Sequence, residues 1–421
     1  MSTQNTSQSP RKSGELDASF GDNGTTLLEG SEVKALAVLK APGADQGKII
    51  GVISTASDFI LFRLEKDGVL DPTFGTTGYS RWGFGNTSTR SVPASITVLS
   101  DNKIFVAGHA QEGSIGGNSY PAAARFNVNG SPDLTFGVSG VFSFREQPPT
   151  AGNTSAPYLQ QTSAIGNLAV VETNEDGKIL FCSNNTIAPY RDWGLLIQLT
   201  STGELDTTFN GQGYAFFKLN GQPTSSIGLV TQKTSGRIIV GGTTATQSFL
   251  AGFTNIGKTD TSFGEDGLAE LKSDTAPLTL SKLLLQSDEK PVAIGRVPTT
   301  GSSRKGYVTR TLPNGKTDST FNNGLPLTID RPLTSLQLNS GDLDSGQSII
   351  VAGELNTRGL SLVGRITKDG TLDPTFGTAG LSNPSEPGTP NYTTSAVVQT
   401  DTQIVIAGRK DSKPSVSRYQ A

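Results

Sequence analysis

One phrase recurs seven times along the 421 residues of this chain: a glycine, an aspartate three residues later, a phenylalanine three residues after that, and then a turn. The first copy begins at Gly14 and contains Asp17 and Phe20. A period of roughly 50 to 70 residues, repeated this often, indicates an array of similar units that bury their apolar faces against their neighbours. The motif aspartates are Asp17, Asp71, Asp133, Asp206, Asp260, Asp318 and Asp373, and the motif phenylalanines are Phe20, Phe74, Phe136, Phe209, Phe263, Phe321 and Phe376.

Each unit contains four strand-like segments, which are clearest in the second unit. We name them A to D, and there they cover residues 95–99, 103–108, 122–126 and 140–144. The turns that join A to B are short, as at Asp176-Gly177, where glycine adopts a positive φ without a Cβ clash. Four antiparallel strands with short turns are typical of a propeller blade.

The two ends of the chain predict how the array closes. The first unit holds only the motif and a D-like strand at 25–28, while the last unit stops after a C-like strand at 416–419. A ring closes if the N-terminal strand completes the last blade, which also removes exposed sheet edges. We therefore predict an all-β, seven-bladed β-propeller of four-stranded antiparallel blades. It should form a single domain over residues 14–421, preceded by a flexible polar tail at 1–13.

The repeat resembles that of a known family. Its pattern combines Asp-Gly-Lys-Ile before strand B, an arginine in strand C, and Gly-x-x-Asp-x-x-Phe-Gly-x-x-Gly. This pattern resembles the delta-60 repeat proteins, a bacterial family of β-propellers with no assigned activity. It is more distantly similar to the NHL-type propeller repeat. The resemblance covers the chain after residue 13 and implies the fold, but it selects no function because NHL-type propellers bind RNA, bind proteins or act as lyases.

Composition excludes several classes of protein. A net charge of −3 offers no electrostatic footprint for nucleic acid, and no basic stripe with interleaved aromatics is present. No apolar run approaches the twenty or so residues of a transmembrane helix. Residues 1–13 lack the apolar stretch of a secretory signal, so we expect a cytoplasmic protein, although export without a leader would leave no trace here. The single cysteine, Cys182, excludes an intrachain disulfide framework.

The repeated residues are best interpreted as scaffold. Each motif aspartate follows a glycine turn, where its carboxylate can accept backbone N–H bonds in an Asx-type turn. The alternative, a ring of calcium ligands, would need a second carboxylate at fixed spacing, and none recurs. The phenylalanines should pack as plugs between blades. An arginine precedes the aspartate by eight residues in most copies, but Gln198 and Gly252 replace it in two.

The rare residues give weak catalytic candidates. Cys182 falls at a strand B position that other units fill with alanine or glycine, which indicates a small buried site. His109 is the only histidine, and no Gly-x-Ser-x-Gly phrase accompanies it. One histidine and one cysteine cannot supply a zinc site, and we expect no cofactor.

The connections between strands predict the working surface. Because strands alternate in direction, the A–B and C–D turns lie on one face, and the B–C and D–A loops lie on the other. The second set varies most, with long copies at 109–121, 145–167 and 183–193. Loops on a rigid scaffold carry recognition, although long loops can also simply cap the channel. The candidate contacts on this face are His109, Tyr120, Tyr158, Tyr190, Arg191 and Trp193.

Three classes of function stay open. We favour a non-enzymatic, monomeric scaffold that recognises a protein or peptide through the variable loop face. A carbohydrate-binding propeller with a single site is the second. A seven-site lectin would need an aromatic at one position in most units, yet Tyr79 and Tyr214 share theirs with Val141, Leu268 and Leu381. The third is a hydrolase or lyase centred on a cation in the channel.

Overall fold

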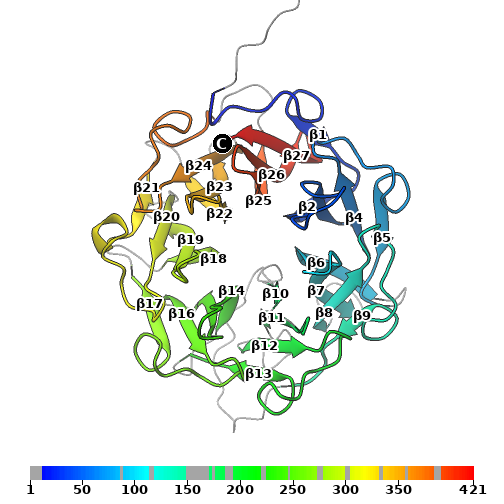
Figure 1. The fold of residues 1–421 in the computed structure, drawn as a ribbon, viewed down its shortest axis with the longest axis vertical. Helices are drawn as coiled ribbons and strands as arrows, with labels where there is room; N and C mark the ends of the chain where they lie inside the picture. Colours follow the sequence, from blue (N-terminus) through cyan, green and yellow to red (C-terminus); the bar gives the residue numbers. More distant parts are fainter. Residues whose placement is uncertain are drawn as a thin grey trace, which may run out of the picture.

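Seven antiparallel sheets surround a central axis in the computed structural model of the protein (Figure 1). The first strand of each sheet lies nearest the axis and the last lies at the rim. The structure describes residues 12–85, 89–112, 118–147, 170–172, 176–184, 193–219, 224–244, 247–272, 278–298, 304–330, 335–355, 359–383 and 390–421. The predicted seven-bladed propeller is confirmed.

The strands follow the chain from blade to blade, and each sheet keeps the sequence order A-B-C-D. Blade 1 has β2 (Glu32–Val38), β3 (Ile49–Ser54), β4 (Phe59–Leu64) and β5 (Tyr79–Trp82). Blade 2 has β6 (Thr89–Val98), β7 (Ile104–Glu112), β8 (Ser119–Phe126) and β9 (Val141–Ser143). Blade 3 has β10 (Val170–Glu172), β11 (Ile179–Asn184), β12 (Gly194–Leu199) and β13 (Tyr214–Phe217). Blade 4 has β14 (Ser225–Thr231), β15 (Ile238–Thr243), β16 (Ser248–Phe253) and β17 (Leu268–Leu271).

The remaining three blades complete the ring. Blade 5 has β18 (Thr279–Leu285), β19 (Pro291–Pro298), β20 (Arg304–Arg310) and β21 (Leu327–Ile329). Blade 6 has β22 (Leu336–Leu343), β23 (Ile349–Leu355) and β24 (Leu360–Ile366), and its outer strand is reduced to a bridge between Gly364 and Leu381. Blade 7 has β25 (Tyr392–Thr400), β26 (Gln403–Lys410), β27 (Lys413–Gln420) and, from the other end of the chain, β1 (Thr25–Leu27).

The N-terminal segment closes the ring. Strand β1 pairs antiparallel with β27, with Thr25 opposite Ser417. The pairing continues beyond the strand, because Leu16 bridges Tyr419 and the Gly14 amide donates to the Gln420 carbonyl at 2.7 Å. The predicted closure by the N-terminal strand is therefore confirmed, and the motif that contains Asp17 serves blade 7.

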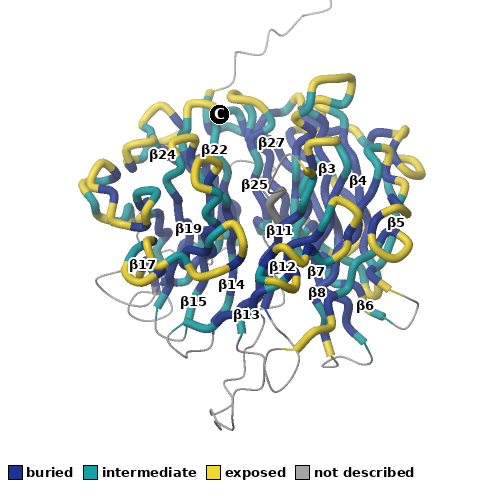
Figure 2. The backbone as a smooth tube through the Cα atoms, turned by 60° about the horizontal axis from the view of Figure 1, so that its bottom comes forward, coloured by how far each residue is buried: buried dark blue, intermediate teal, exposed yellow. Residues whose placement is uncertain are grey.

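Buried apolar side chains fill the spaces between neighbouring sheets, and exposed residues concentrate in the connections (Figure 2). Successive side chains along a strand point in turn toward the two neighbouring blades. In β23, for example, Ile349 and Val351 pack in the cluster shared with blade 5, while Ile350 and Ala352 pack in the cluster shared with blade 7. This period of two explains why strands B and C are apolar almost throughout: both of their faces are buried.

Innermost strands carry a β-bulge at one shared level. The register shifts by one residue in strand A of blades 1, 2, 4, 5, 6 and 7. In five of these blades a strand B glycine lies beside the shift, because the strand A carbonyl comes close to its Cα. A Cβ on Gly353, for instance, would lie 2.0 Å from the Gln337 carbonyl oxygen. The bulge residues are Lys34, Ala94, Ile227, Ser281, Asn339 and Thr394.

One predicted loop is wrong. Residues 109–121 were expected to form the B–C loop of blade 2, but β7 and β8 remain paired through most of that span. His109 lies opposite Pro121 and Gln111 lies opposite Ser119. The pairing also buries two polar side chains of this span, since Gln111 is 6% exposed and Ser119 is 4% exposed.

The only helical segment in the described residues is a three-residue 3-10 turn at Asn322–Gly324, so none of them forms a helix that could cross a membrane.

Truncation tests the closure. Deleting residues 1–30 should destabilise the protein strongly, because the deletion removes β1, Asp17 and Phe20 and leaves β27 with an unpaired edge. Deleting residues 1–11, which supply none of these groups, should leave the melting temperature nearly unchanged. Circular-dichroism melts of the two truncated proteins measure the difference. Equal, small effects would contradict closure by β1.

Candidate functional site

The motif aspartates each fold the turn that follows strand C. In every copy Oδ1 accepts the backbone N–H of the residue two positions later at 2.9–3.2 Å, and the hydroxyl of the same residue at 2.6–2.7 Å. That residue is always serine or threonine. The structure therefore shows an Asx-type turn in all seven blades.

The second oxygen of each aspartate binds a side chain of the same sheet. Oδ2 accepts from the strand C arginine in five blades, as in the 2.7 Å bond from Arg125 Nε to Asp133. Blade 3 uses the Gln198 amide at 2.7 Å. In blade 4, where Gly252 replaces the arginine, Arg237 reaches across from the start of strand B to Asp260 at 2.7 Å. The position of the donor varies, but the contact is kept.

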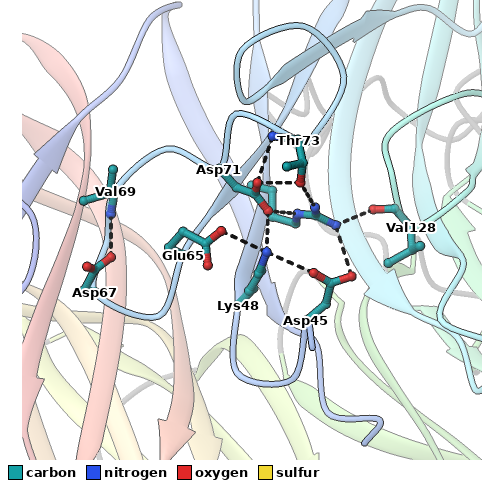
Figure 3. A network of polar contacts seen from close by, with 9 residues as sticks. Asp45, Lys48, Glu65, Asp67, Val69, Asp71, Thr73 and Val128 are labelled. Carbon is teal, nitrogen blue, oxygen red and sulfur yellow. Dashed lines mark hydrogen bonds and ion pairs between the residues drawn. The ribbon is translucent and has the colours of Figure 1, made fainter. Parts of the chain in front are cut away.

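Blade 1 has the most elaborate version of this network (Figure 3). Lys48 Nζ lies 2.7 Å from Asp71, 2.9 Å from Glu65 and 3.0 Å from Asp45, and Arg63 Nε lies 2.6 Å from Asp71. Burial raises the pKa of Asp71, but hydrogen bonds from Lys48 and Thr73 outweigh it and hold that pKa well below its usual range. Asp71 is therefore a fixed anion and a poor proton donor.

Each motif phenylalanine packs against the next blade. The Phe74 ring lies between the Arg63 guanidinium, 5.1 Å from the ring centroid, and Gly130 of blade 2. A Cβ on Gly130 would lie 2.8 Å from that ring, and Gly130 also has a φ of +85°, so two constraints select glycine. The same contact recurs around the ring, and the phenylalanines are no more than 1% exposed.

A backbone hydrogen bond accompanies each of these contacts. In every blade the residue after the motif phenylalanine donates its N–H to the C–D turn of the next blade at 2.7–2.9 Å. The series includes the two junctions that the N-terminal segment makes: Gly377 of blade 6 donates to Ser13, and Gly21 donates to Asp67 of blade 1. We call the phenylalanine, the glycine it covers and this hydrogen bond the interblade clasp. The repeated motif is therefore used for assembly of the ring.

Truncating one clasp measures its contribution. Phe136→Ala should lower the free energy of unfolding by about 3–5 kcal/mol, because it leaves a cavity between blades 2 and 3. Leu134→Ala, in the same turn but 63% exposed, should change it by less than about 0.5 kcal/mol. Urea unfolding of the two variants gives the comparison. Equal effects would show that the ring of Phe136 does not hold the blades together.

Tyr120 lies on the B–C and D–A loop face, opposite the face that holds the clasps. It belongs to a charged cluster at the edge of blade 2. It lies at the start of β8, and the Arg145 guanidinium stacks 4.4 Å from its ring centroid. Arg145 also pairs with Glu112, at the end of β7, at 2.5 Å. The side chains of Arg145 and Glu112 are 55% and 42% exposed, so a partner can reach both.

Trp193 belongs to an adjoining cluster on blade 3. The Lys218 ammonium lies 4.8 Å from its ring centroid, and the Phe216 ring lies 6.4 Å away. Phe216 in turn lies 6.0 Å from Phe144, the neighbour of Arg145 in the chain. Aromatic rings at these spacings interact directly. The two clusters are thus linked by rings across the blade 2–blade 3 junction, and we call their shared surface the aromatic–cation patch: Glu112, Tyr120, Arg145, Trp193, Phe216 and Lys218.

The other sequence candidates do not join this patch in the described structure. Tyr158, Tyr190 and Arg191 lie outside the described residues. His109 lies in β7, 3% exposed, with Nε2 at 3.3 Å from the Ser183 hydroxyl and Nδ1 without a partner in the described structure. Cys182 is a fully buried free thiol. Sequence reasoning missed four residues of the patch that lie at or near strand ends: Glu112, Arg145, Phe216 and Lys218. The only sequence feature that pointed to them was their proximity to the long loops.

His109 should make stability depend on pH. Burial lowers its pKa to about 4, against about 6.5 in the unfolded chain, so the unfolded state binds the proton more tightly. This contribution is complete above pH 6.5 and is lost as the pH falls toward 4. Between pH 7.5 and pH 4.5 the loss should be roughly 2–3 kcal/mol.

Urea unfolding at both pH values measures this effect. The His109→Gln variant should lose less stability than the wild type over the same interval, because its amide does not titrate. Groups other than His109 contribute equally to both proteins and cancel in the difference. Parallel pH profiles would show that His109 titrates normally in the folded state.

Within the described residues, no three His, Cys, Asp or Glu side chains come close enough together to hold a metal ion.

Comparison with known proteins supports the architecture. Residues 47–74 and 99–136 match the family described as "Domain of unknown function (DUF5122) beta-propeller". In blade 1 the matched segment runs from the start of strand B to the motif phenylalanine. In blade 2 it covers the equivalent part of the repeat. No curated protein sequence matches the chain.

Several solved β-structures are similar to this chain over most of its length. The Myceliophteria thermophila Cps50 (Swd1) β-propeller domain has a TM-score of 0.51 and 8% identity, covering 95% of this chain and 99% of its own. Virginiamycin B lyase from Staphylococcus aureus has a TM-score of 0.48 and 11% identity, covering 93% and 98%. A PL25 ulvan lyase has a TM-score of 0.48 and 10% identity, covering 94% and 95%. At 8% identity, the likeness to the Cps50 domain shows the fold alone.

Proposed function

We propose that this DUF5122-type β-propeller is a non-enzymatic binding module that recognises a protein or peptide through its B–C and D–A loop face. The observation that carries the proposal is the aromatic–cation patch on blades 2 and 3. The assignment to the delta-60 repeat proteins, supported by the seven motif copies, is part of the same proposal.

The patch has the chemistry of a recognition surface. Tyr120, Trp193 and Phe216 are partly exposed and offer large apolar areas with few rotatable bonds. Arg145 and Lys218 are already stacked on aromatic rings, so they lose little further freedom when they pair with a carboxylate of the partner. These features favour a partner segment that carries acidic side chains beside aliphatic or aromatic ones.

The distribution of roles between the two faces also supports this function. The C–D connections hold the clasps, so the shape of this face of the ring is fixed by assembly. All seven motif carboxylates bind groups of their own blade, which leaves none of them available as a catalytic base or calcium ligand. The loop face is not constrained in this way.

Affinity capture tests the proposal. Trp193→Ala and Lys218→Glu should each reduce recovery of a captured partner at least tenfold, because they remove the aromatic anchor and reverse the charge stacked on it. Both variants should keep the wild-type melting temperature within a few degrees, since both side chains are partly exposed.

A control variant separates the two faces of the ring. Val138→Ala, 83% exposed in the C–D connection of blade 2, should capture the partner as the wild type does. Undiminished capture by both patch variants would place the site elsewhere. Loss of capture in Val138→Ala alone would place it on the clasp face.

A further inference from the structure

Three cationic side chains lie on one side of blade 5, the side that faces blade 6. Lys282 in β18 is opposite Ile294, and Arg296 in β19 is opposite Gly306. Ile294 packs in the cluster shared with blade 6, which fixes the direction of this side. Because side chains alternate along a strand, Lys282, Arg296 and Arg304 all project from it. Direct evidence comes from Arg304 Nη1, which donates to Gln337 of blade 6 at 2.9 Å.

The wall of blade 6 opposite these cations is apolar. The blade 6 residues that pack toward blade 5 include Leu336, Leu338 and Val351, which are at most 1% exposed. The two acidic side chains of this part of blade 6, Asp342 and Glu354, project from its other side, toward blade 7. Asp342 lies opposite Ile350, and Glu354 shares the side of Ile350 by the period of two. Asp342 Oδ2 accepts the blade 7 amide of Val398 at 2.8 Å.

Two of the three cations have no close ion pair in the described structure, and the acidic groups that act on them, Asp342 on Lys282 and Glu354 on Arg296, lie farther away. Within the described residues, Lys282 and Arg296 make neither a hydrogen bond nor an ion pair shorter than 4 Å. The buried cations elsewhere in the ring include three that are paired: Lys48 with Asp71, Arg125 with Asp133 and Arg310 with Asp318. Arg296 differs from them because it is partly buried and has no ion pair with a described residue.

The electrostatic cost of this arrangement is visible in the ionisation of the groups. Lys282 is exposed on the innermost strand, yet desolvation by the surrounding ring lowers its pKa, and the charge of Asp342 in blade 6 opposes this effect. Burial also lowers the pKa of Arg296, and the neighbouring charge of Arg304 lowers it further, while Glu354 opposes both effects. Burial raises the pKa of Glu354, so ionisation of this carboxyl is itself disfavoured.

We propose that the corner formed by Lys282, Arg296 and Arg304 is a binding site for an oxyanion: a carboxylate, sulfate or phosphate group of a ligand that enters from the loop face. An anion between Arg296 and Arg304 converts their mutual repulsion into two attractive contacts. Lys282 adds a third positive charge on the side nearest the axis. This site lies on blades 5 and 6, apart from the aromatic–cation patch on blades 2 and 3.

The site is partly organised before a ligand arrives. Gln337 accepts from Arg304 through Oε1, and its own amide nitrogen donates to Asn339 Oδ1 at 2.8 Å. Asn339 is the bulge residue of blade 6, and it donates to the Thr393 carbonyl of blade 7 at 2.8 Å. This chain of hydrogen bonds across three blades holds the Arg304 guanidinium in position, so little ordering is left for the binding step.

Thermal melts and isothermal titration with three simple salts test the proposal. Sodium sulfate, sodium phosphate and sodium acetate are compared at constant ionic strength, with chloride as the background. At least one should raise the melting temperature of the wild type saturably, and the order of the three identifies the preferred chemistry. Lys282→Met and Arg296→Gln should each weaken that response at least tenfold. Arg409→Gln, an exposed arginine on the same face of blade 7, is the matched control and should respond as the wild type does.

A second readout does not need any ligand. In chloride alone, Lys282→Met and Arg296→Gln should melt at or above the wild-type temperature, since each removes a positive charge that has no close ion pair. Three results would overturn the proposal. They are an equal anion response in these variants and Arg409→Gln, no saturable response of the wild type to any of the salts, or clearly lower melting of the folded variants in chloride.

Discussion

The interblade clasp is the contact on which the ring depends. A propeller blade has two large apolar faces and cannot bury either alone, so each junction must fix the distance and rotation between two sheets. Here a phenylalanine of one blade covers a glycine of the next, and a backbone hydrogen bond beside it sets the register. The aspartate shapes the turn that presents the phenylalanine, and in most blades an arginine stacks on the ring from behind. Motif glycine, aspartate and phenylalanine are thus parts of a single joint.

Much of this could be predicted from the sequence because the repeat is regular. The number of blades follows from the motif copies, and closure follows from the incomplete units at the two ends. Other features depend on which residues the fold brings close together. Arg237 replaces the arginine missing at Gly252, but it belongs to a different strand, 23 residues before Asp260. The sequence predicts a loop at 109–121, whereas β7 and β8 pair there and bury Gln111 and Ser119.

The candidate sites show the same limit more strongly. Long loops pointed to the face on which Tyr120 and Trp193 lie, but no spacing rule joins Arg145 to Tyr120 or Lys218 to Trp193. The anion corner was not foreseen, since its side chains come from three strands. Only the register of those strands, together with the bulge at Ser281, places them on one side of blade 5. Assembly chemistry repeats in every blade and can be read from the sequence. Recognition chemistry occurs once, where irregular segments meet.

Amide hydrogen exchange at the seam of the ring tests the central claim most directly. If the clasp formed by the two chain ends is equivalent to the internal ones, the amides of Gly21 and Gly377 should exchange as slowly as those of Gly75 and Gly137, through global unfolding only. Exchange at the two seam amides that is faster by orders of magnitude, with the internal clasp amides still protected, would show that the ring opens at its ends and that the motif does not join them.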